Sequence, residues 1–276
     1  MIGTLYIVAT PIGNLDDITF RAVDTLKSVD VILAEDTRHS KRLLNHYDLK
    51  TELRAFHEHN EKHKTQAVIA ELLEGKNMAL ISDAGTPLIS DPGYVLVREA
   101  KKSGVVVSPI PGASAMISAM SAAGIASDQF GFFGFLPNKQ TARIKAIQAI
   151  AHSDQSVIFY ESPKRILACA YDLQSVLGDE RIVCFAKELT KSFETINTDT
   201  LPNLINYLEA DPAHQKGEFV ILISSIDKDN KVAGEEQLDT ILPILLTEMG
   251  ASKAAKLAAK ITGIDKKYCY KRAIDL

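Results

Sequence analysis

The sequence LISDAGTPLISDPG occupies residues 80–93 and begins with an apolar run that is typical of a buried strand. It continues into Asp, Ser, Thr, Gly and Pro, and its first half, ISDAGTPL, is echoed at once by ISDPGYVL. A chain reversal needs only one or two such residues, so a loop this long and this stiff is expected to do more than turn the chain. We therefore predict that a ligand binds on this loop.

Two further loops of the same kind follow apolar runs in the first 120 residues. VATPIG ends at residue 13 after the run TLYIV, and PIPGASA covers 109–115 after VVVS. Ligands bind at the carboxyl ends of strands in open α/β sheets, so three such loops predict a binding site at one sheet edge. None of them matches GxGxxG or GxxxxGK[ST], which disfavours a Rossmann dinucleotide site and a P-loop. Asp16 or Asp17 is predicted to cap the helix that begins near Thr19.

Short β-rich runs alternate with segments of helical periodicity along most of the chain, which predicts an α/β fold with mainly parallel or mixed sheets. The runs are GTLYIVA, DVILAE, NMALIS, VVVSPI, FGFFGF, QSVIFYE, RIVCFAKE and GEFVILIS. We divide the chain into an N-terminal α/β domain (1–111), a second α/β domain (112–225), a polar linker (226–236) and a small basic helical module (237–276).

Composition indicates an ordinary globular protein, with 276 residues and 46% hydrophobic residues. The three cysteines are widely spaced and form no CxxC, so neither a disulfide framework nor a zinc site is predicted. No apolar run approaches the ~20 residues that a membrane-spanning helix requires, and the N-terminus lacks the features of a signal peptide. We therefore expect a cytoplasmic protein without a membrane partner.

The charge is unevenly distributed along the chain. The formal net charge of -4 argues against a general nucleic-acid binder. From Gly250 to Leu276, however, seven basic residues stand against two acidic ones, which gives this segment a net charge of +5 and leaves about -9 on the rest. A basic surface on the last helices is predicted.

Several motifs occur in one order along the chain: GTLYIVATPIGNLDDIT, AEDTR, HEHNE, ALISDAGTPLISDPG, PIPGASA, FGFLP, FYESPKR and KELTK. Together they resemble the tetrapyrrole-methylase superfamily, and within it the branch that methylates a cytidine 2'-oxygen in the decoding centre of 16S rRNA. The resemblance covers the whole chain, including the helical tail. It implies S-adenosylmethionine held in a cleft between two α/β domains of a homodimer, with RNA in the 30S ribosomal subunit as substrate.

The resemblance also assigns residues to the cofactor. The assigned positions are Pro11, Ile12, Asp83, Ala84, Gly85, Thr86, Ile89, Ser114 and Ala115 in the first domain, and Tyr160 and Gly217 in the second. Thr86 stands where the wider superfamily has an acid, so a carboxylate contact would come from Asp83 or Asp91 instead.

Methyl transfer to a ribose hydroxyl is an in-line displacement that depends on positioning, together with a base or a cation near the hydroxyl. The candidates for this role are Lys187, Glu188, His57 and His59. Each motif also has a structural alternative: HEHNE as a hydrogen-bonded loop or a metal site, AEDTR as a helix cap in which Arg38 pairs with a carboxylate, and KELTK as a strand-end ion pair. No metal is predicted.

Contacts with RNA are expected from basic and polar side chains near the strand ends, together with the basic tail. These are Arg38, Arg42, His59, Asn60, Arg143, Lys164 and Arg165. Two other functions stay open: methylation of a tetrapyrrole-like small molecule at carbon, and a ribosome-assembly factor that has lost catalysis. The basic tail and HEHNE favour the RNA enzyme over the small-molecule enzyme, because a porphyrinoid substrate gives a basic module no evident use.

Overall fold

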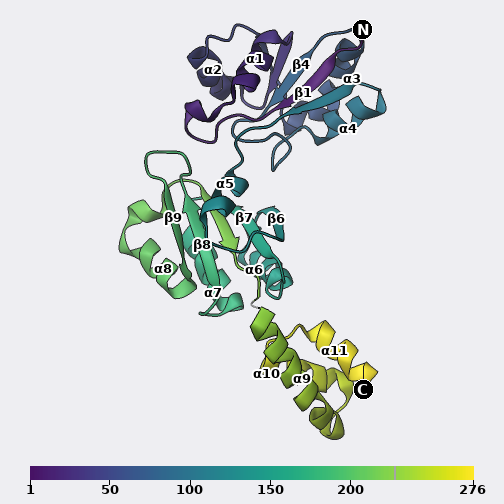
Figure 1. The fold of residues 1–276 in the computed structure, drawn as a ribbon, viewed down its shortest axis with the longest axis vertical. Coiled ribbons are helices and arrows are strands. Elements are labelled where there is room, and N and C mark those ends of the chain that lie inside the picture. The colour runs from purple at the N-terminus through teal and green to yellow at the C-terminus, as the bar shows by residue number, and fades with distance from the viewer. Residues whose placement is uncertain (227) are drawn as a thin grey trace. The chain divides into compact units, whose positions relative to one another are not determined.

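The computed structural model describes residues 1–226 and 228–276, with the side chains of 228–236 left out of the description (Figure 1). The chain splits into two compact units. The first unit comprises Met1–Ala122 and Ala186–Ile196, and the second comprises Ala123–Phe185 and Asn197–Leu276. The segment Ala186–Ile196 includes the end of β8 (Ile182–Lys187) and the start of β9 (Thr195–Thr200), so it belongs with the first unit although both strands lie in the second sheet. The domain boundaries given above stay a prediction.

The first unit contains a five-stranded parallel sheet in the order β3-β2-β4-β1-β5. Its strands are β1 (Thr4–Val8), β2 (Val31–Ala34), β3 (Glu52–Ala55), β4 (Met78–Ile81) and β5 (Val106–Ile110). The helices of this unit are α1 (Phe20–Ser28), α2 (Thr37–His46), α3 (Glu58–Leu73), α4 (Tyr94–Lys102) and α5 (Ala115–Ala122), with a short 3-10 helix η1 (Leu15–Asp17) before α1.

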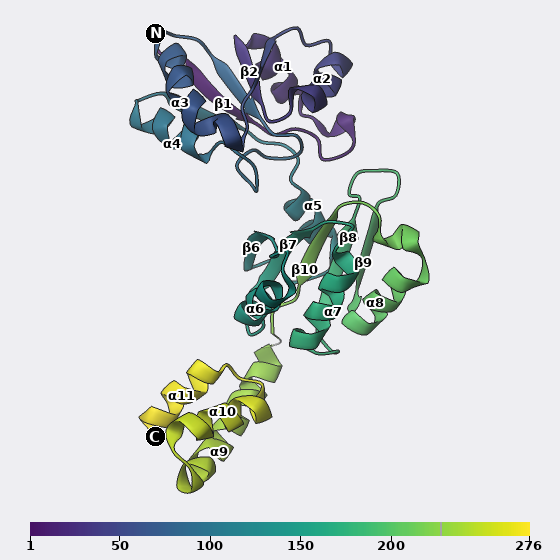
Figure 2. The same cartoon turned by 180° about the vertical axis from the view of Figure 1, so that it is seen from behind.

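Alternating strand residues pack against different helices, which makes this sheet the middle of three layers (Figure 2). Val31 and Leu33 of β2 lie in one core with residues of α3 and α4. Ile32 and Ala34 lie in the other core, with residues of α1 and α2. Because both faces are covered, the carboxyl edge of the sheet and its loops are left for ligands.

A buried carboxylate joins two of these helices. The side chain of Glu61, in the first turn of α3, is 7% exposed. Its Oε1 accepts hydrogen bonds from the backbone N–H groups of Gly93, Val95 and Leu96, at 3.1, 3.0 and 3.3 Å. These are the free donors at the start of α4, where a negative charge is favourable. Glu61 therefore fixes the point at which the 80–93 loop enters α4.

The second unit contains a mixed sheet in the order β6-β7-β10-β8-β9. Its strands are β6 (Phe130–Phe135), β7 (Ser156–Glu161), β8 (Ile182–Lys187), β9 (Thr195–Thr200) and β10 (Phe219–Ile223). Residues of α6 (Gln140–Ile150), α7 (Ile166–Leu177) and α8 (Leu201–Ala210) share one hydrophobic core with this sheet, and η2 (Pro212–Gln215) follows α8.

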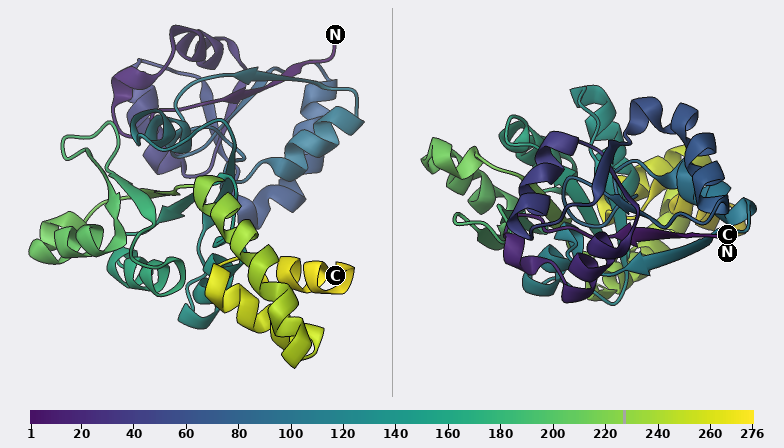
Figure 3. Two further views of the ribbon diagram at one scale, coloured as in Figure 1. Left: turned by 60° about the horizontal axis from the view of Figure 1, so that its bottom comes forward. Right: turned by 90° about the horizontal axis from the view of Figure 1, so that it is seen from above.

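Three helices end the chain: α9 (Lys228–Glu248), α10 (Ala251–Thr262) and α11 (Lys266–Asp275) (Figure 3). They pack around a small core that includes Leu242, Ala255 and Cys269. The predicted helical character of the C-terminal module is confirmed. The range 226–236 was predicted as a linker; the structure has α9 from Lys228 onward there, residue 227 lies outside the described residues, and the linker stays a prediction.

All eight predicted strands are present, and the structure adds two that the sequence analysis missed, β3 and β9. Both lie at sheet edges, where polar side chains are tolerated. The predicted cap of α1 by Asp16 or Asp17 is wrong. Thr19 caps this helix itself, because its Oγ1 accepts a hydrogen bond from the N–H of Ala22 at 3.1 Å. Within the described part of the chain, no helix is both long and apolar enough to cross a membrane.

Replacing Glu61 by alanine is expected to loosen the start of α4. Three buried N–H groups would lose their acceptor, which costs about 1–3 kcal/mol of local stability. The backbone amides of Gly93, Val95 and Leu96 should then exchange with deuterium at least tenfold faster than in the unmodified protein. Glu58→Ala, at an exposed position in the same turn of α3, is the matched control. Unchanged exchange at all three amides would contradict the capping role.

Candidate functional site

The loops that follow β1, β4 and β5 are joined by direct hydrogen bonds at the carboxyl edge of the first sheet. Thr10 and Gly85 form a two-residue antiparallel bridge, with N···O distances of 2.9 and 3.0 Å. The Thr86 hydroxyl donates to the carbonyl oxygen of Ala113 at 3.1 Å. The predicted cofactor positions in the first unit therefore lie on loops that contact one another.

The 80–93 loop owes its stiffness to repeated left-handed backbone conformations. Gly85 has φ 79° and Gly93 has φ 129°, and between them Leu88 and Ser90 have φ 75° and 67°. Non-glycine residues rarely adopt such angles, and the strain is stored where the surrounding structure enforces a particular backbone shape. This is the shape expected of a preformed ligand cradle, and it accounts for the unusual composition of the segment.

A fourth loop, residues 188–194, packs on the loop after β1. The N–H of Asn14 donates to Thr190 Oγ1 at 3.0 Å. Glu188 and Thr190 adopt left-handed φ angles of 51° and 65°. Sequence reasoning named Lys187 and Glu188 but missed Thr190, and no pattern in KELTK distinguishes it.

The two candidate catalytic residues of this segment differ in environment. Lys187 ends β8 and is only 7% exposed. The carboxylate of Glu188 lies 2.8 Å from the ammonium of Lys191. A buried ammonium and a paired carboxylate are thus adjacent in sequence, beside the loop that carries Pro11 and Ile12.

Carboxylates gather where β2 and β4 end. Asp83 Oδ1 accepts a hydrogen bond from the backbone N–H of Asp36 at 3.0 Å. Burial, followed by the charges of Asp83 and Glu58, raises the pKa of Glu35. Burial, followed by the charge of Glu35, raises the pKa of Asp91 to about 6. These groups share one region of negative potential, which suits a cationic or hydroxyl-rich ligand.

The structural alternative for AEDTR is confirmed. Asp36 caps α2, since its Oδ1 accepts from the N–H of Arg38 at 2.8 Å. The guanidinium of Arg38 also pairs with Asp36 at 3.2 Å while it stays largely exposed, and this contact lowers the pKa of Asp36. Arg42 lies on the exposed side of the same helix. Both arginines remain accessible for the predicted contact with RNA.

HEHNE forms the N-cap and first turn of α3 rather than the hydrogen-bonded loop given as its structural alternative. His57 is the N-cap residue, and its N–H donates to Asn60 Oδ1 at 3.0 Å. The amide nitrogen of Asn60 lies 3.0 Å from His57 Nε2. His57 and Asn60 therefore hold each other in a structural arrangement, and His59 is the exposed histidine of the motif. Among the described residues, no group of three His, Cys, Asp or Glu side chains has an arrangement suited to a metal ion.

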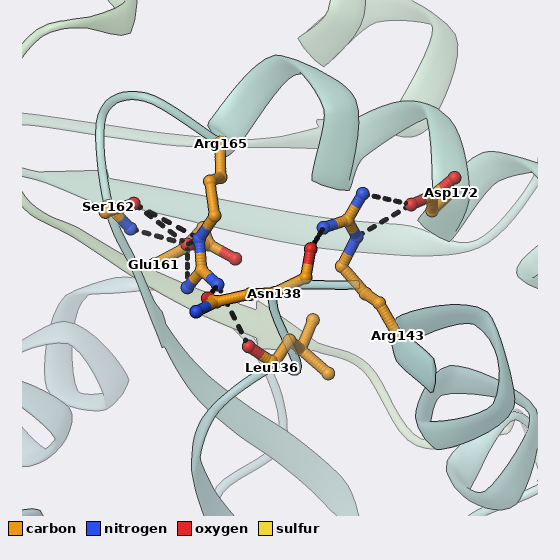
Figure 4. Close-up of polar contacts among 7 residues, drawn as sticks. All are labelled: Leu136, Asn138, Arg143, Glu161, Ser162, Arg165 and Asp172. Carbon is orange, nitrogen blue, oxygen red and sulfur yellow. Dashed lines mark hydrogen bonds and ion pairs between the residues drawn. The ribbon is translucent and has the colours of Figure 1, made fainter. Parts of the chain in front are cut away.

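Two arginines that were predicted to contact RNA lie in ion pairs inside the second unit (Figure 4). Arg143 is 5% exposed, and its guanidinium lies 2.6 Å from Asp172. A side chain this buried is not accessible to phosphate, so the prediction for Arg143 is wrong. The guanidinium of Arg165 pairs with the buried Glu161 at 2.6 Å and also contacts the side chain of Asn138.

Asn138 joins the two pairs, because its backbone oxygen also accepts a hydrogen bond from Arg143. We conclude that both arginines position the loop between β6 and α6. Lys164, between Glu161 and Arg165 in sequence, is exposed, so it remains a candidate for contact with RNA.

The two predicted cofactor residues of the second unit lie near strand ends, Tyr160 in β7 and Gly217 before β10. The ring of Tyr160 packs edge-on against Phe132 and Phe135, with ring centroids 4.8 and 5.7 Å apart. Gly217 has φ 91°, just before β10. Their contact with a cofactor stays a prediction.

Replacing Gly13 by alanine is expected to displace the 188–194 loop. The added Cβ would lie 2.6 Å from Lys191 Cγ and 2.7 Å from Thr190 Oγ1, closer than any normal contact. Cleavage by trypsin after Lys191 should become faster, because the loop loses its packing. Gly250→Ala is the matched control, since its Cβ would meet nothing within 4 Å. Equal cleavage rates in both variants would show that the loop does not depend on this contact.

Asp91→Asn is expected to stabilise the protein in a pH-dependent manner. Because the folded pKa of Asp91 is raised to about 6, the favourable contribution of its protonated form is lost as the pH rises through that value. The melting temperature of the variant should therefore exceed that of the unmodified protein at pH 7.5 by more than it does at pH 4.5. Asp24→Asn, at an exposed site on α1, is the control. A pH-independent difference for Asp91→Asn would contradict the assignment.

Family models match most of the chain. Residues 4–205 match the tetrapyrrole (corrin/porphyrin) methylases, and residues 232–276 match the RsmI C-terminal HTH domain. The chain is 49% identical to ribosomal RNA small subunit methyltransferase I of Haemophilus influenzae, over 97% of this chain and 95% of that protein. Its identity to the protein of the same name from Pseudomonas aeruginosa is 47%, over 99% and 97%.

Solved structures support the same fold at low sequence identity. The methyltransferase CobJ matches with a TM-score of 0.60 and 18% identity, over 81% of this chain and 95% of that one. Diphthine synthase matches with a TM-score of 0.61 and 16% identity, over 81% and 90%. The resemblance to the tetrapyrrole-methylase superfamily is thus confirmed, and the chain belongs to the tetrapyrrole methylase family and, within it, to the family of small-subunit ribosomal RNA methyltransferases.

Proposed function

We propose that this methyltransferase transfers a methyl group from S-adenosylmethionine to the ribose 2'-oxygen of a cytidine in the decoding centre of 16S rRNA, within the 30S particle. The observation that carries the proposal is the extent of the similarity. The rRNA methyltransferases match 97–99% of the chain, including α9–α11, whereas the uroporphyrin-III-C-methyltransferase of Thermus thermophilus covers 82%. The additional basic helices have no evident role in an enzyme that methylates a small molecule.

The carboxyl edge of the first sheet fits the proposed methyl donor. Pro11, Ile12, Gly85, Ser114 and Ala115 lie on or next to loops that contact one another, and the loop that carries Gly85 has repeated left-handed backbone angles. When bound, S-adenosylmethionine supplies a methyl group on a positively charged sulfur, so the departing thioether is neutral and needs no acid.

Carboxylates near the sulfonium would favour binding of this cation. Asp83 accepts the N–H of Asp36, Glu35 lies near it, and Asp91 follows on the same loop. Asp83 or Asp91 would thereby supply the carboxylate that the wider superfamily carries at the position of Thr86. Donor binding by this arrangement is expected to be weaker below pH 6, where Asp91 is protonated.

The ribose hydroxyl becomes a competent nucleophile only as its proton leaves. A bond forms between the 2'-oxygen and the methyl carbon as the carbon–sulfur bond breaks in line with it, and the proton passes to a base or to water. We assign Lys187 to stabilise the developing negative oxygen, because a buried ammonium acts strongly where water is excluded. Glu188 is the proton acceptor, and Lys191 orients its carboxylate.

Contact with the RNA is assigned to the outward side of α2, which begins at the same sheet edge. Its exposed residues include Arg38, His39, Lys41, Arg42 and His46, and the helix itself contains no acidic residue. This row supplies positive charge to phosphates next to the target ribose. His59 and Lys164 are further exposed candidates.

We further propose that the protein is a cytoplasmic homodimer. The resemblance to the family supports the dimer, and so does the edge strand β6, where Phe133 and Phe135 are 54% and 55% exposed. Apolar side chains of this size on an unpaired strand edge favour coverage by a second protein surface.

The decisive experiment supplies labelled S-adenosylmethionine and the purified protein to three acceptors: 30S particles, free 16S rRNA and a tetrapyrrole precursor. Nuclease digestion and mass spectrometry then locate the label. We expect 2'-O-methylcytidine, with particles preferred over free RNA, because a folded particle presents the local shape that a net acidic protein needs for recognition.

Two results would overturn the proposal. Label in the tetrapyrrole, or at a carbon or nitrogen atom of a base, would assign a different acceptor. Tight binding of the donor and of 30S particles without transfer would favour an assembly factor that has lost catalysis.

A further inference from the structure

The outward side of α11 carries a row of basic and aromatic residues. Lys267, Tyr270, Lys271 and Ile274 are all exposed and follow the i, i+3, i+4, i+7 spacing of one helix face. The opposite face holds Cys269 and Ala273, which are buried against the other helices. The row therefore faces away from the small core of the module.

A second row lies on α10, again opposite its buried face. Lys253, Lys256 and Lys260 are exposed, while Ala254, Ala255 and Ala258 are buried. Their i, i+3, i+7 spacing places the three ammonium groups on one side of the helix. Because α10 and α11 are adjacent helices of one packed module, both rows belong to a single small unit (Figure 3).

The lysines of these two rows form no ion pair among the residues of the module whose side chains the structure describes. Among residues 237–276, whose side chains the structure describes, Arg272 forms an ion pair with Asp239 at 2.9 Å. Asp265 is engaged as the N-cap of α11, where its Oδ1 accepts from the N–H groups of Lys267 and Tyr268 at 2.8 and 3.1 Å. The lysines of both rows have no such partner among these described residues.

Two lysines of the module stand at positions where positive charge destabilises a helix. Lys266 and Lys267 stand in the first turn of α11, which contains no acidic residue. Positive charge at a helix N-terminus is unfavourable, because the peptide dipoles already place partial positive charge there. Stability of the helix thus does not explain these lysines.

We propose that the α10 and α11 rows dock the C-terminal module on the sugar-phosphate backbone of a helical stem in the RNA substrate, outside the nucleotide that is methylated. Ammonium groups at this spacing suit phosphates, and Tyr270 supplies a hydroxyl and a ring of the kind that contacts ribose. The deep, narrow major groove of A-form RNA excludes a helix, so the contact is with the backbone and the wide minor groove, and it reads shape rather than sequence.

The inference rests on the proposed rRNA function, and the test separates the two. Three full-length variants are compared: Lys253→Gln/Lys256→Gln/Lys260→Gln on α10, Lys267→Gln/Lys271→Gln on α11, and the control Lys27→Gln/Lys101→Gln/Lys216→Gln, whose three lysines are exposed outside the module. Methyl transfer to 30S particles is measured as kcat and KM at several salt concentrations. Binding of S-adenosylmethionine alone and thermal melting serve as checks on the site and on folding.

For both module variants we expect KM for 30S particles to rise about tenfold or more, with kcat at saturation and donor affinity unchanged. The dependence of log KM on log salt should become shallower, by about 2 to 3 for the α10 variant if each lysine contacts one phosphate. The control variant should differ from the unmodified protein by less than twofold in KM.

An unchanged KM and salt slope in both module variants would overturn the inference and leave the proposed function intact. A rise in KM that the control variant matches would also overturn it, since the effect would then reflect net charge rather than a docking surface. Absence of any methyl transfer to 30S particles by the unmodified protein would instead remove the proposed function.

Discussion

The two backbone hydrogen bonds between Thr10 and Gly85 hold together the part of the molecule on which the candidate site depends. They tie the loop after the central strand β1 to the loop after its neighbour β4, and Thr86 extends the connection to the loop after β5. Gly112 completes the arrangement, because a Cβ at this position would come within 2.9 Å of Ala9 Cβ. A site made of backbone groups keeps its shape only if its loops constrain one another in this way.

The interior of the fold was largely predictable from the sequence. Strands such as β4 and β10 are continuous apolar runs, because parallel or central strands are buried on both faces. The edge strands β3 and β9 were missed, since segments such as TINTDT lack the apolar content that reveals a strand. The early part of α9 was missed for a similar reason, because polar residues without periodicity form a helix there.

The candidate site was predicted unevenly. Glycine-rich and proline-rich loops after strands mark a ligand site in the sequence itself, because turn residues report the backbone shape directly. The ion-pair partners of charged side chains cannot be read from the sequence in this way. Arg143 and Arg42 look alike in the sequence, yet one is buried against Asp172 and the other faces outward from α2. The raised pKa of Asp91 likewise depends on neighbours that are distant in sequence, such as Glu35.

The position of Glu61 couples the start of α3 to the start of α4. It belongs to the first turn of α3, directly after His57, His59 and Asn60. Its carboxylate accepts hydrogen bonds from the backbone at the start of α4, where the 80–93 loop ends. A displacement of α3 is therefore expected to shift the end of the 80–93 loop through this single carboxylate. We therefore expect the start of α3, with its exposed histidine, and the strained 80–93 loop to move together rather than independently.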